Sequence, residues 1–326
     1  MGRTINWKEY KFRASQCHKL LTGDIVDASI YNDQINELEN ERDTLTNSNG
    51  NKVKWTTNKE EKLKKLKELA SKPLFERLPK TMTTELRKIH RAEKHNRNFS
   101  FTNKYVQKGI QQEEEAITIY QYYRNKVLGI RTFFINNKER LQNEFVSGEA
   151  DLTDTNDFEK CNEGFDTKCS WELETFPYKE DVLDSQYEIQ NQVYMWLSNT
   201  EKWTTAYVLV NTTEDLLHKE KMKWYYALGL HHSNRTDKEQ EELEVSYDEK
   251  CKELEIRFIF DYDKFVERNP MHNLIITREE WFENGYNLDL EERVVEKISL
   301  RNNDIISKLK NRIEISRKYL EYLDKN

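Results

Sequence analysis

The segments VSGEAD (146–151), GFDTKC (164–169) and QNQVYM (190–195) decide the fold. The first two overlap short strand-like segments at 142–147 and 165–169. The third lies in a stretch whose apolar residues have helical spacing. Because a helix at about 103–125 precedes them and a strand-like run, TTAYVLVN (204–211), follows, we expect an α/β fold in which helices flank a mixed central sheet.

Helical patterns dominate the chain on both sides of this core. A basic helix is predicted at about 81–95, after Pro73 and Pro79, and the apolar spacing at about 303–323 predicts a terminal helix. We expect a single domain over 1–326, with a mainly helical insertion at 31–100, a core at 101–215, and a C-terminal strand and helices at 216–326. The other elements expected are helices at 31–43 and 59–70, strands at 142–147 and 254–260, and a polar surface loop at 231–244.

The composition limits the class of protein. Charged residues make up 34% of the 326 residues and aromatic residues 12%, which fits a folded protein with a polar surface. No run approaches the 18 apolar residues of a membrane span, and the first ten residues lack the apolar segment of a signal peptide. The four cysteines form no Cys-x-x-Cys pair, so neither a zinc site nor a disulfide framework is expected. These features predict a cytoplasmic protein with reduced thiols.

Asp166 and Lys168 form an unusual pair for a core strand. Side chains two residues apart on a strand point to the same side of the sheet, so one acid and one base would share a face. A hairpin return over 152–163 would bring Asp151 beside Asp166. By itself an acid-x-Lys triplet in so charged a chain is better explained as a surface ion pair. In combination with Asp151, it predicts a cleft that binds a cation and a phosphate.

Glu113 is a third candidate carboxylate. On the helix predicted at 103–125 it falls on the stripe formed by Val106, Gly109, Ile110, Ala116, Ile117 and Tyr120. A carboxylate on an apolar face is costly unless a cation compensates its charge. The alternative is a partly exposed glutamate at the end of the stripe.

Three converging carboxylates would repel one another without a divalent cation. Oxygen ligands and a phosphoester substrate favour Mg²⁺, with Mn²⁺ as a substitute. Such an ion would activate a bound water molecule, and Lys168 would orient or deprotonate that water or neutralise developing charge.

The segment from Lys80 to Lys108 carries an excess of basic side chains, eight against two acids, although the whole chain has a net charge of −7. This stretch could face a phosphate backbone. The alternative is an ordinary solvated helix face.

These motifs resemble the PD-(D/E)xK nuclease superfamily, and within it the phage exonucleases of the YqaJ and lambda exonuclease type. The matching segments are GIQQE (109–113), GEAD (148–151), DTKC (166–169) and QNQVYM (190–195). The resemblance implies a restriction-endonuclease-like core. It also implies that Glu113, Asp151, Asp166 and the main-chain carbonyl of Thr167 bind the metal, and that Gln190 acts with Lys168 in catalysis.

The resemblance implies DNA contacts as well. Arg13 and Ser15 match positions that hold a DNA end phosphate, and the basic stretch contributes Arg87, Lys88, Arg91, Lys104 and Lys108. Two departures stand out: Ala150 replaces the usual proline, and Glu149 occupies a position that is often serine or threonine. The latter puts the end-binding mode in question. For Gln190 and Tyr194, one turn apart on a helix with a core face, simple packing is the alternative.

The function expected from the resemblance is a Mg²⁺-dependent deoxyribonuclease, an exonuclease that trims linear duplex ends during phage-type recombination in the host cytoplasm. A ring-forming homo-oligomer and a single-strand annealing protein are the partners expected besides DNA. Two alternatives stay open: a structure-specific or restriction-like endonuclease that uses the same site, and a DNA-binding or scaffold protein that has lost catalysis.

Overall fold

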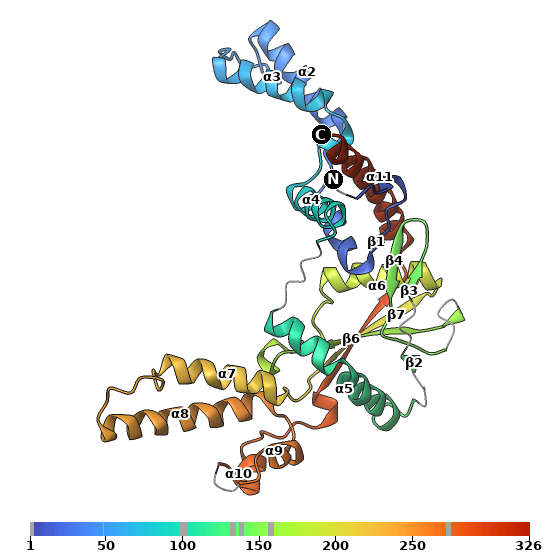
Figure 1. The fold of residues 1–326 in the computed structure, drawn as a ribbon. Helices are drawn as coiled ribbons and strands as arrows, with labels where there is room; N and C mark the ends of the chain where they lie inside the picture. The colour runs from blue at the N-terminus through green and yellow to red at the C-terminus, as the bar shows by residue number, and fades with distance from the viewer. Residues whose placement is uncertain are drawn as a thin grey trace. The chain divides into compact units, whose positions relative to one another are not determined.

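The computed structural model describes residues 3–47, 49–97, 103–130, 135–136, 140–155, 160–271 and 275–326 (Figure 1). The chain forms two compact units, each built from segments far apart in the sequence. The first comprises Met1–Phe99, Gln142–Gly148 and Asn302–Asn326, and the second comprises Ser100–Leu141 and Glu149–Arg301. The predicted mixed α/β class is confirmed. In the described part of the chain, no helix is long and apolar enough to cross a membrane.

The first unit is mainly helical. Its terminal helix α11 (Asn303–Lys325) buries Ile306, Leu309 and Ile313, which are spaced by three and four residues as the sequence predicted. This face packs against α4 (Lys80–Lys94) and α1 (Cys17–Leu21). The remaining elements of this unit are η1 (Trp7–Glu9), β1 (Phe12–Arg13), η2 (Ala14–Gln16), α2 (Ala28–Thr44), α3 (Thr57–Ser71), η3 (Leu74–Glu76) and most of β4 (Val146–Glu149), which pairs in parallel with β1.

Helices α2 and α3 lie side by side as a hairpin (Figure 1). Their shared core is small and consists of Ile35 and Leu38 from α2 with Leu63 and Leu66 from α3. Two ion pairs, Lys59–Glu41 and Lys67–Glu39, join α3 to α2. The helices predicted at 31–43 and 59–70 are thus confirmed.

The second unit contains a five-stranded mixed sheet with the order β2-β5-β6-β7-β8. Strands β6 and β7 are parallel, and the other pairs are antiparallel. The strands are β2 (Ile135–Asn136), β5 (Leu152–Thr153), β6 (Gly164–Cys169), β7 (Lys202–Val208) and β8 (Val294–Leu300). The short strand β3 (Arg140–Gln142) contains residues assigned to both units.

Two helices cover opposite faces of this sheet. Helix α5 (Lys104–Lys126) packs Ala116 and Tyr120 against Phe165 and Ala206. Helix α6 (Ser185–Ser198) lies on the other face, where Asn191 donates a hydrogen bond to Thr205 at 2.9 Å. Since side chains alternate along a strand, the face under α6 also receives Asp166 and Lys168.

The remaining helices follow β7. Helices α7 (Glu214–Ala227) and α8 (Asp237–Phe258) run side by side as a hairpin (Figure 1). At its base, Leu216, Leu254 and Phe258 pack with Trp171 and Trp281. The short elements here are η5 (Leu173–Thr175), α9 (Tyr262–Arg268), α10 (Arg278–Glu283) and η7 (Leu290–Glu292).

Three local predictions are wrong. The run 254–260 belongs largely to the end of α8 rather than to a strand, and its Leu254 and Phe258, four residues apart, lie on one buried face of that helix. Most of 231–244 is not a loop, since α8 begins at Asp237 behind a Thr236 capping box. The strand predicted at 142–147 is interrupted where Oδ1 of Asn143 accepts hydrogen bonds from the main-chain N–H groups of Phe145 and Val146.

Candidate active site

The open edge of β6 organises the candidate site. Strand β5 pairs with β6 at Phe165 and Gly164, and within the described residues the edge of β6 beyond Phe165 has no strand partner on that side. Asp151, just before β5, reaches this edge instead. Its Oδ2 accepts hydrogen bonds from the main-chain N–H of Thr167 at 2.7 Å and from the Thr167 hydroxyl at 3.1 Å. As the hairpin return predicted over 152–163 requires, β5 pairs with β6 and Asp151 lies beside the acid-x-Lys strand. Residues 156–159 of this return lie outside the described residues.

The carbonyl of Thr167 faces the same edge as its N–H. In a strand, the N–H and C=O of one residue point to the same side, and the N–H of Thr167 is directed at Asp151. The carbonyl named as a ligand by the resemblance is thus placed at the edge where Asp151 lies.

A pocket of about 360 Å³ opens at this edge. It brings together Glu113 from α5, Asp151, and Lys168 from β6, three of the predicted catalytic residues. The other lining residues are Tyr105, Val106, Gly109, Ile110, Thr167, Cys169 and Tyr187. Sequence reasoning missed Tyr187, whose only signal was its place one turn before Gln190 on α6.

The apolar stripe around Glu113 has two different halves. Ala116 and Tyr120 are fully buried in the core, whereas Val106 and Ile110 are 43% and 68% exposed and line the pocket. Glu113 lies where the stripe passes from core to pocket. Its carboxylate is therefore half-buried at the pocket wall rather than enclosed in the core.

Asp166 lies behind Lys168. The carboxylate is 2% exposed and forms an ion pair with the Lys168 ammonium through Oδ2. Burial by itself would lower the pKa of Lys168, but the charges of Asp166 and Asp151 outweigh it and raise that pKa, so the ammonium stays charged. The ring centre of Tyr187 lies 5.2 Å from the same ammonium.

The pocket concentrates negative charge. Burial raises the pKa of Asp151 to about 7, and the neighbouring charges of Asp166 and Glu113 add to the rise, while Lys168 and the Thr167 N–H oppose it. Burial also raises the pKa of the Cys169 thiol to about 12, so this thiol is neutral. Crowded, partly desolvated carboxylates of this kind are stabilised by a bound cation.

The carboxylates are not gathered around a common point. Among the described residues, no group of three or more His, Cys, Asp or Glu side chains is arranged to hold a metal ion. Glu113 and Asp151 share the pocket, while Asp166 is engaged by Lys168. The donor set nevertheless fits a hard cation in its chemistry, since it offers carboxylate oxygens and the Thr167 carbonyl.

Gln190 takes part in a chain of hydrogen bonds that reaches the segment before Asp151. It is buried and donates a hydrogen bond to the Tyr194 hydroxyl at 2.8 Å, which in turn donates to the carbonyl of Glu149 at 2.9 Å. These bonds connect α6 to the residue two positions before Asp151. A direct catalytic role for Gln190 stays a prediction.

The predicted DNA contacts fall into three groups. Lys108 is fully buried and donates to the carbonyl of Trp171 at 2.9 Å, so its predicted contact with DNA is wrong. Lys104 lies at the start of α5, 3.8 Å from Glu220 and 4.5 Å from the ring centre of Trp171. The others, all exposed, belong to the first unit: Arg13, Ser15, Arg87, Lys88 and Arg91.

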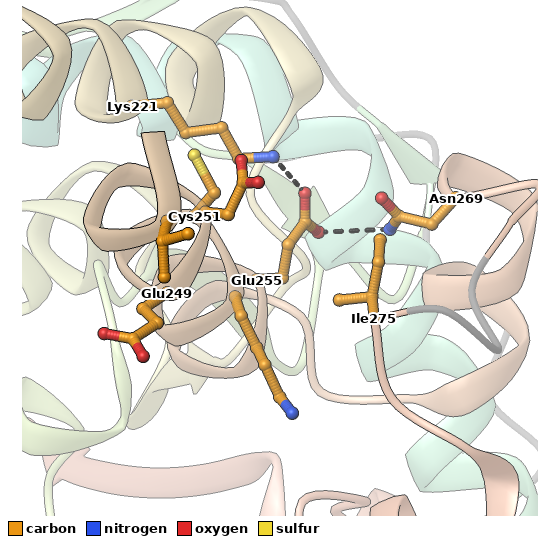
Figure 2. A pocket seen from close by; sticks show the side chains of 9 residues that line it. Lys221, Glu249, Cys251, Glu255, Asn269 and Ile275 are labelled. Carbon is orange, nitrogen blue, oxygen red and sulfur yellow. Dashed lines mark hydrogen bonds and ion pairs between the residues drawn. The ribbon is translucent and has the colours of Figure 1, made fainter. Parts of the chain in front are cut away.

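A larger pocket, of about 530 Å³, lies beside α8 (Figure 2). Its buried charges are engaged by one another, because Glu255 accepts from Lys221 and from Asn269. Its other lining residues are Val245, Asp248, Glu249, Cys251, Lys252 and Ile275. The larger pocket has no carboxylate or lysine from the edge of a strand among its lining residues. The smaller pocket at the edge of β6 has both, and it is therefore the better candidate for the active site.

Comparison with known proteins supports the fold. The structure is similar to the crystal structure of a phage-related exonuclease from Haemophilus somnus 129PT, with a TM-score of 0.54 and 20% sequence identity over 97% of this chain and 96% of that one. It also matches an alkaline exonuclease from Laribacter hongkongensis, with a TM-score of 0.43 and 9% identity over 99% and 97% of the two chains. No protein-family model and no curated protein matches the chain.

Proposed function

We propose that this chain is a metal-dependent deoxyribonuclease, an exonuclease acting on the ends of linear duplex DNA. One observation carries the proposal: the pocket at the open edge of β6 combines Glu113, Asp151 and Lys168, with Asp166 directly behind Lys168. The phage-related exonuclease with a similar fold supports this choice of reaction.

Mg²⁺, or Mn²⁺ in its place, would supply an activated water molecule and charge stabilisation at the scissile phosphate. Glu113, Asp151, Asp166 and the Thr167 carbonyl would hold the ion. The two hydrogen bonds from Thr167 fix the orientation of the Asp151 carboxylate. Lys168, kept charged by Asp166, orients the water or neutralises the charge that develops on the phosphate.

Glu149 bears on how a DNA end is held. It occupies the position where the resemblance leads us to expect a phosphate contact, and its carboxylate forms an ion pair with Arg140 at 3.3 Å. Arg140 thereby offsets the negative charge that would repel a phosphate. This arrangement is compatible with a DNA end near the pocket.

The test compares linear duplex DNA with covalently closed circular DNA, each incubated with the purified chain and Mg²⁺ or Mn²⁺. We expect progressive release of nucleotides from the linear substrate, no cleavage of the closed circle, and no activity when the metal is chelated. Cleavage of the closed circle would favour the endonuclease alternative. Intact DNA in every reaction would refute both nuclease proposals and leave the DNA-binding alternative.

The wider biological role is proposed on the same basis. We infer that the enzyme acts in phage-type recombination in the host cytoplasm, as a ring-forming homo-oligomer and together with a single-strand annealing protein. Sedimentation of the purified chain tests the oligomer: a monomer at every concentration would contradict it.

A further inference from the structure

Lys297 is a buried lysine whose ammonium is held entirely by backbone. It lies on β8, is 7% exposed, and donates hydrogen bonds to three carbonyls: those of Tyr178 at 2.6 Å, Lys179 at 2.7 Å and Asp181 at 2.5 Å. No carboxylate of the described residues forms an ion pair with it. A lysine rarely becomes this buried without a carboxylate, so the three carbonyls are the compensation for its desolvation.

The three carbonyls belong to one tight turn. The N–H of Tyr178 donates to the Asp181 side chain at 2.7 Å, and the N–H of Asp181 donates to the Tyr178 carbonyl at 3.2 Å. The turn is otherwise exposed: Tyr178 is 73% exposed, and the side chains of 179–181 are exposed as well. Because its large side chains point to solvent, the turn has little packing of its own, and Lys297 is its main anchor to the sheet.

Lys297 shares the catalytic face of the sheet. It is paired in register with Thr205 on β7, and Thr205 is paired with Asp166 on β6. Paired residues project to the same side, so the side chains of Asp166, Thr205 and Lys297 form one row across three strands. The turn held by Lys297 therefore lies on the face that carries Asp166 and Lys168.

The turn leads directly into α6. Asp184, three residues beyond Asp181, caps the helix by accepting a hydrogen bond from the N–H of Gln186 at 2.7 Å. The first turn of α6 carries Tyr187, which lines the pocket beside Lys168. The middle of α6 has a separate attachment, through Asn191 to Thr205 and Ser299. Glu188 in the first turn also accepts a hydrogen bond from the Ser299 hydroxyl, so the helix start that carries Tyr187 is held to the sheet both by this bond and by the anchored turn before it.

We propose that Lys297 is a positioning residue of the nuclease site: it holds the Tyr178–Asp181 turn and thereby places Tyr187 against Lys168. This inference rests on the proposed nuclease function. It predicts that loss of the ammonium slows catalysis while the sheet and the middle of α6 keep their structure.

The experiment compares Lys297→Met with Lys297→Arg and with the wild type. Methionine keeps the length and apolar stem without any donor, whereas arginine restores several donors. We expect Lys297→Met to lower kcat on linear duplex DNA by roughly 10- to 100-fold, as loss of supporting contacts around a site commonly does, with little change in KM. Lys297→Arg should recover most of the loss. If the methionine variant does not fold, Lys297→Gln, which keeps two donors, takes its place.

Arg235→Met is the matched control. Arg235 also donates to a turn carbonyl, that of Gly229 at 2.6 Å, in the connection between α7 and α8. Its loss should leave kcat unchanged. A wild-type kcat in Lys297→Met, or an equal loss of kcat in Arg235→Met, would overturn the inference.

Hydrogen exchange separates this inference from the proposed function. In Lys297→Met, peptides covering 177–184 and the first turn of α6 should exchange faster, while the rest of α6 keeps its protection. Unchanged exchange in these peptides would refute the anchoring whatever the activity. A wild-type chain that does not cleave DNA would refute the proposed function, and with it the catalytic part of this inference, while the exchange result still decides the anchoring.

Discussion

Thr167 binds Asp151 twice, through its main-chain N–H at 2.7 Å and its hydroxyl at 3.1 Å, and both bonds end on the same carboxylate oxygen. The backbone bond stands where, among the residues that the structure describes, β6 has no strand partner at this edge. It also fixes a carboxylate beside Lys168 without using a flexible loop to hold it. The candidate site is thus built on the sheet itself.

The first prediction concerns Asp151→Asn. The amide can still accept the hydrogen bonds from Thr167, so the fold should persist, but the charge that would hold a divalent ion is lost. We expect nuclease activity to fall by more than about 100-fold, which corresponds to several kcal/mol of transition-state stabilisation. Mg²⁺ or Mn²⁺ should raise the Tm of the wild type and have less effect on the variant. Equal metal-induced shifts in Tm would contradict a role of Asp151 as a ligand.

The second prediction concerns pH and follows from the raised pKa of Asp151. Burial and the charges of Asp166 and Glu113 raise this pKa from 3.8 to about 7 in the folded chain without metal. Between these values the folded state keeps a proton that the unfolded state has released. Stability contributed by this group therefore falls as the pH rises from about 4 to about 7.

The measurement is the free energy of unfolding of the wild type and of Asp151→Asn, in chelator, across that pH range. Relative to the wild type, the variant should gain stability toward pH 7, by on the order of a few kcal/mol. A difference between the two proteins that is independent of pH would show that Asp151 titrates normally.

The third prediction concerns Lys108, whose pKa burial lowers to about 7 from 10.5. Between these values the unfolded chain holds a proton that the folded chain lacks, so the contribution of Lys108 to stability rises with pH from about 7 to about 10. In Lys108→Met this contribution disappears. The stability of the variant relative to the wild type should therefore fall across this range, by on the order of a few kcal/mol.

Because the Lys108 side chain is buried, its substitution should not change the salt dependence of DNA binding. A smaller salt dependence in the variant would show that Lys108 contacts a phosphate after all.

The fourth prediction concerns Gly164, the first residue of β6. A Cβ atom at this position would overlap the ring of Trp203, which is fully buried against Tyr194. Gly164→Ala should destabilise the second unit by about 1–3 kcal/mol, since neither ring can move freely. Urea unfolding measures this, and Gly109→Ala, where a Cβ would meet nothing within 4 Å, is the control. Equal stability of the two variants would contradict the packing described.

Much of the core could be predicted from the sequence because its elements have clear periodicity. The helix at about 103–125 became α5, and the acid-x-Lys run became β6. Strand β8, VVEKISL, was missed because Lys297 interrupts its apolar pattern. That lysine fits a buried strand only because three carbonyls of a distant turn compensate it. Contacts of this kind depend on tertiary structure and leave no local signal.

The site was predicted in part for a similar reason. Asp151, Lys168 and Glu113 share a pocket as expected from the motifs, but the exposure of Val106 and Ile110 could not be deduced from periodicity. A helical stripe has the same spacing whether it faces a core or a pocket. Burial of Lys108 was missed because charge in a basic stretch indicates a surface unless a buried acceptor, here the Trp171 carbonyl, is known.

The most direct test of the metal-dependent nuclease site is the rate of nucleotide release from linear duplex DNA by the wild type, Asp166→Asn and Lys168→Met, with Mg²⁺ and with chelator. The account predicts release by the wild type that requires the metal, and a loss of more than about 100-fold in each variant. Release that continues in chelator, or that survives both substitutions, would contradict it.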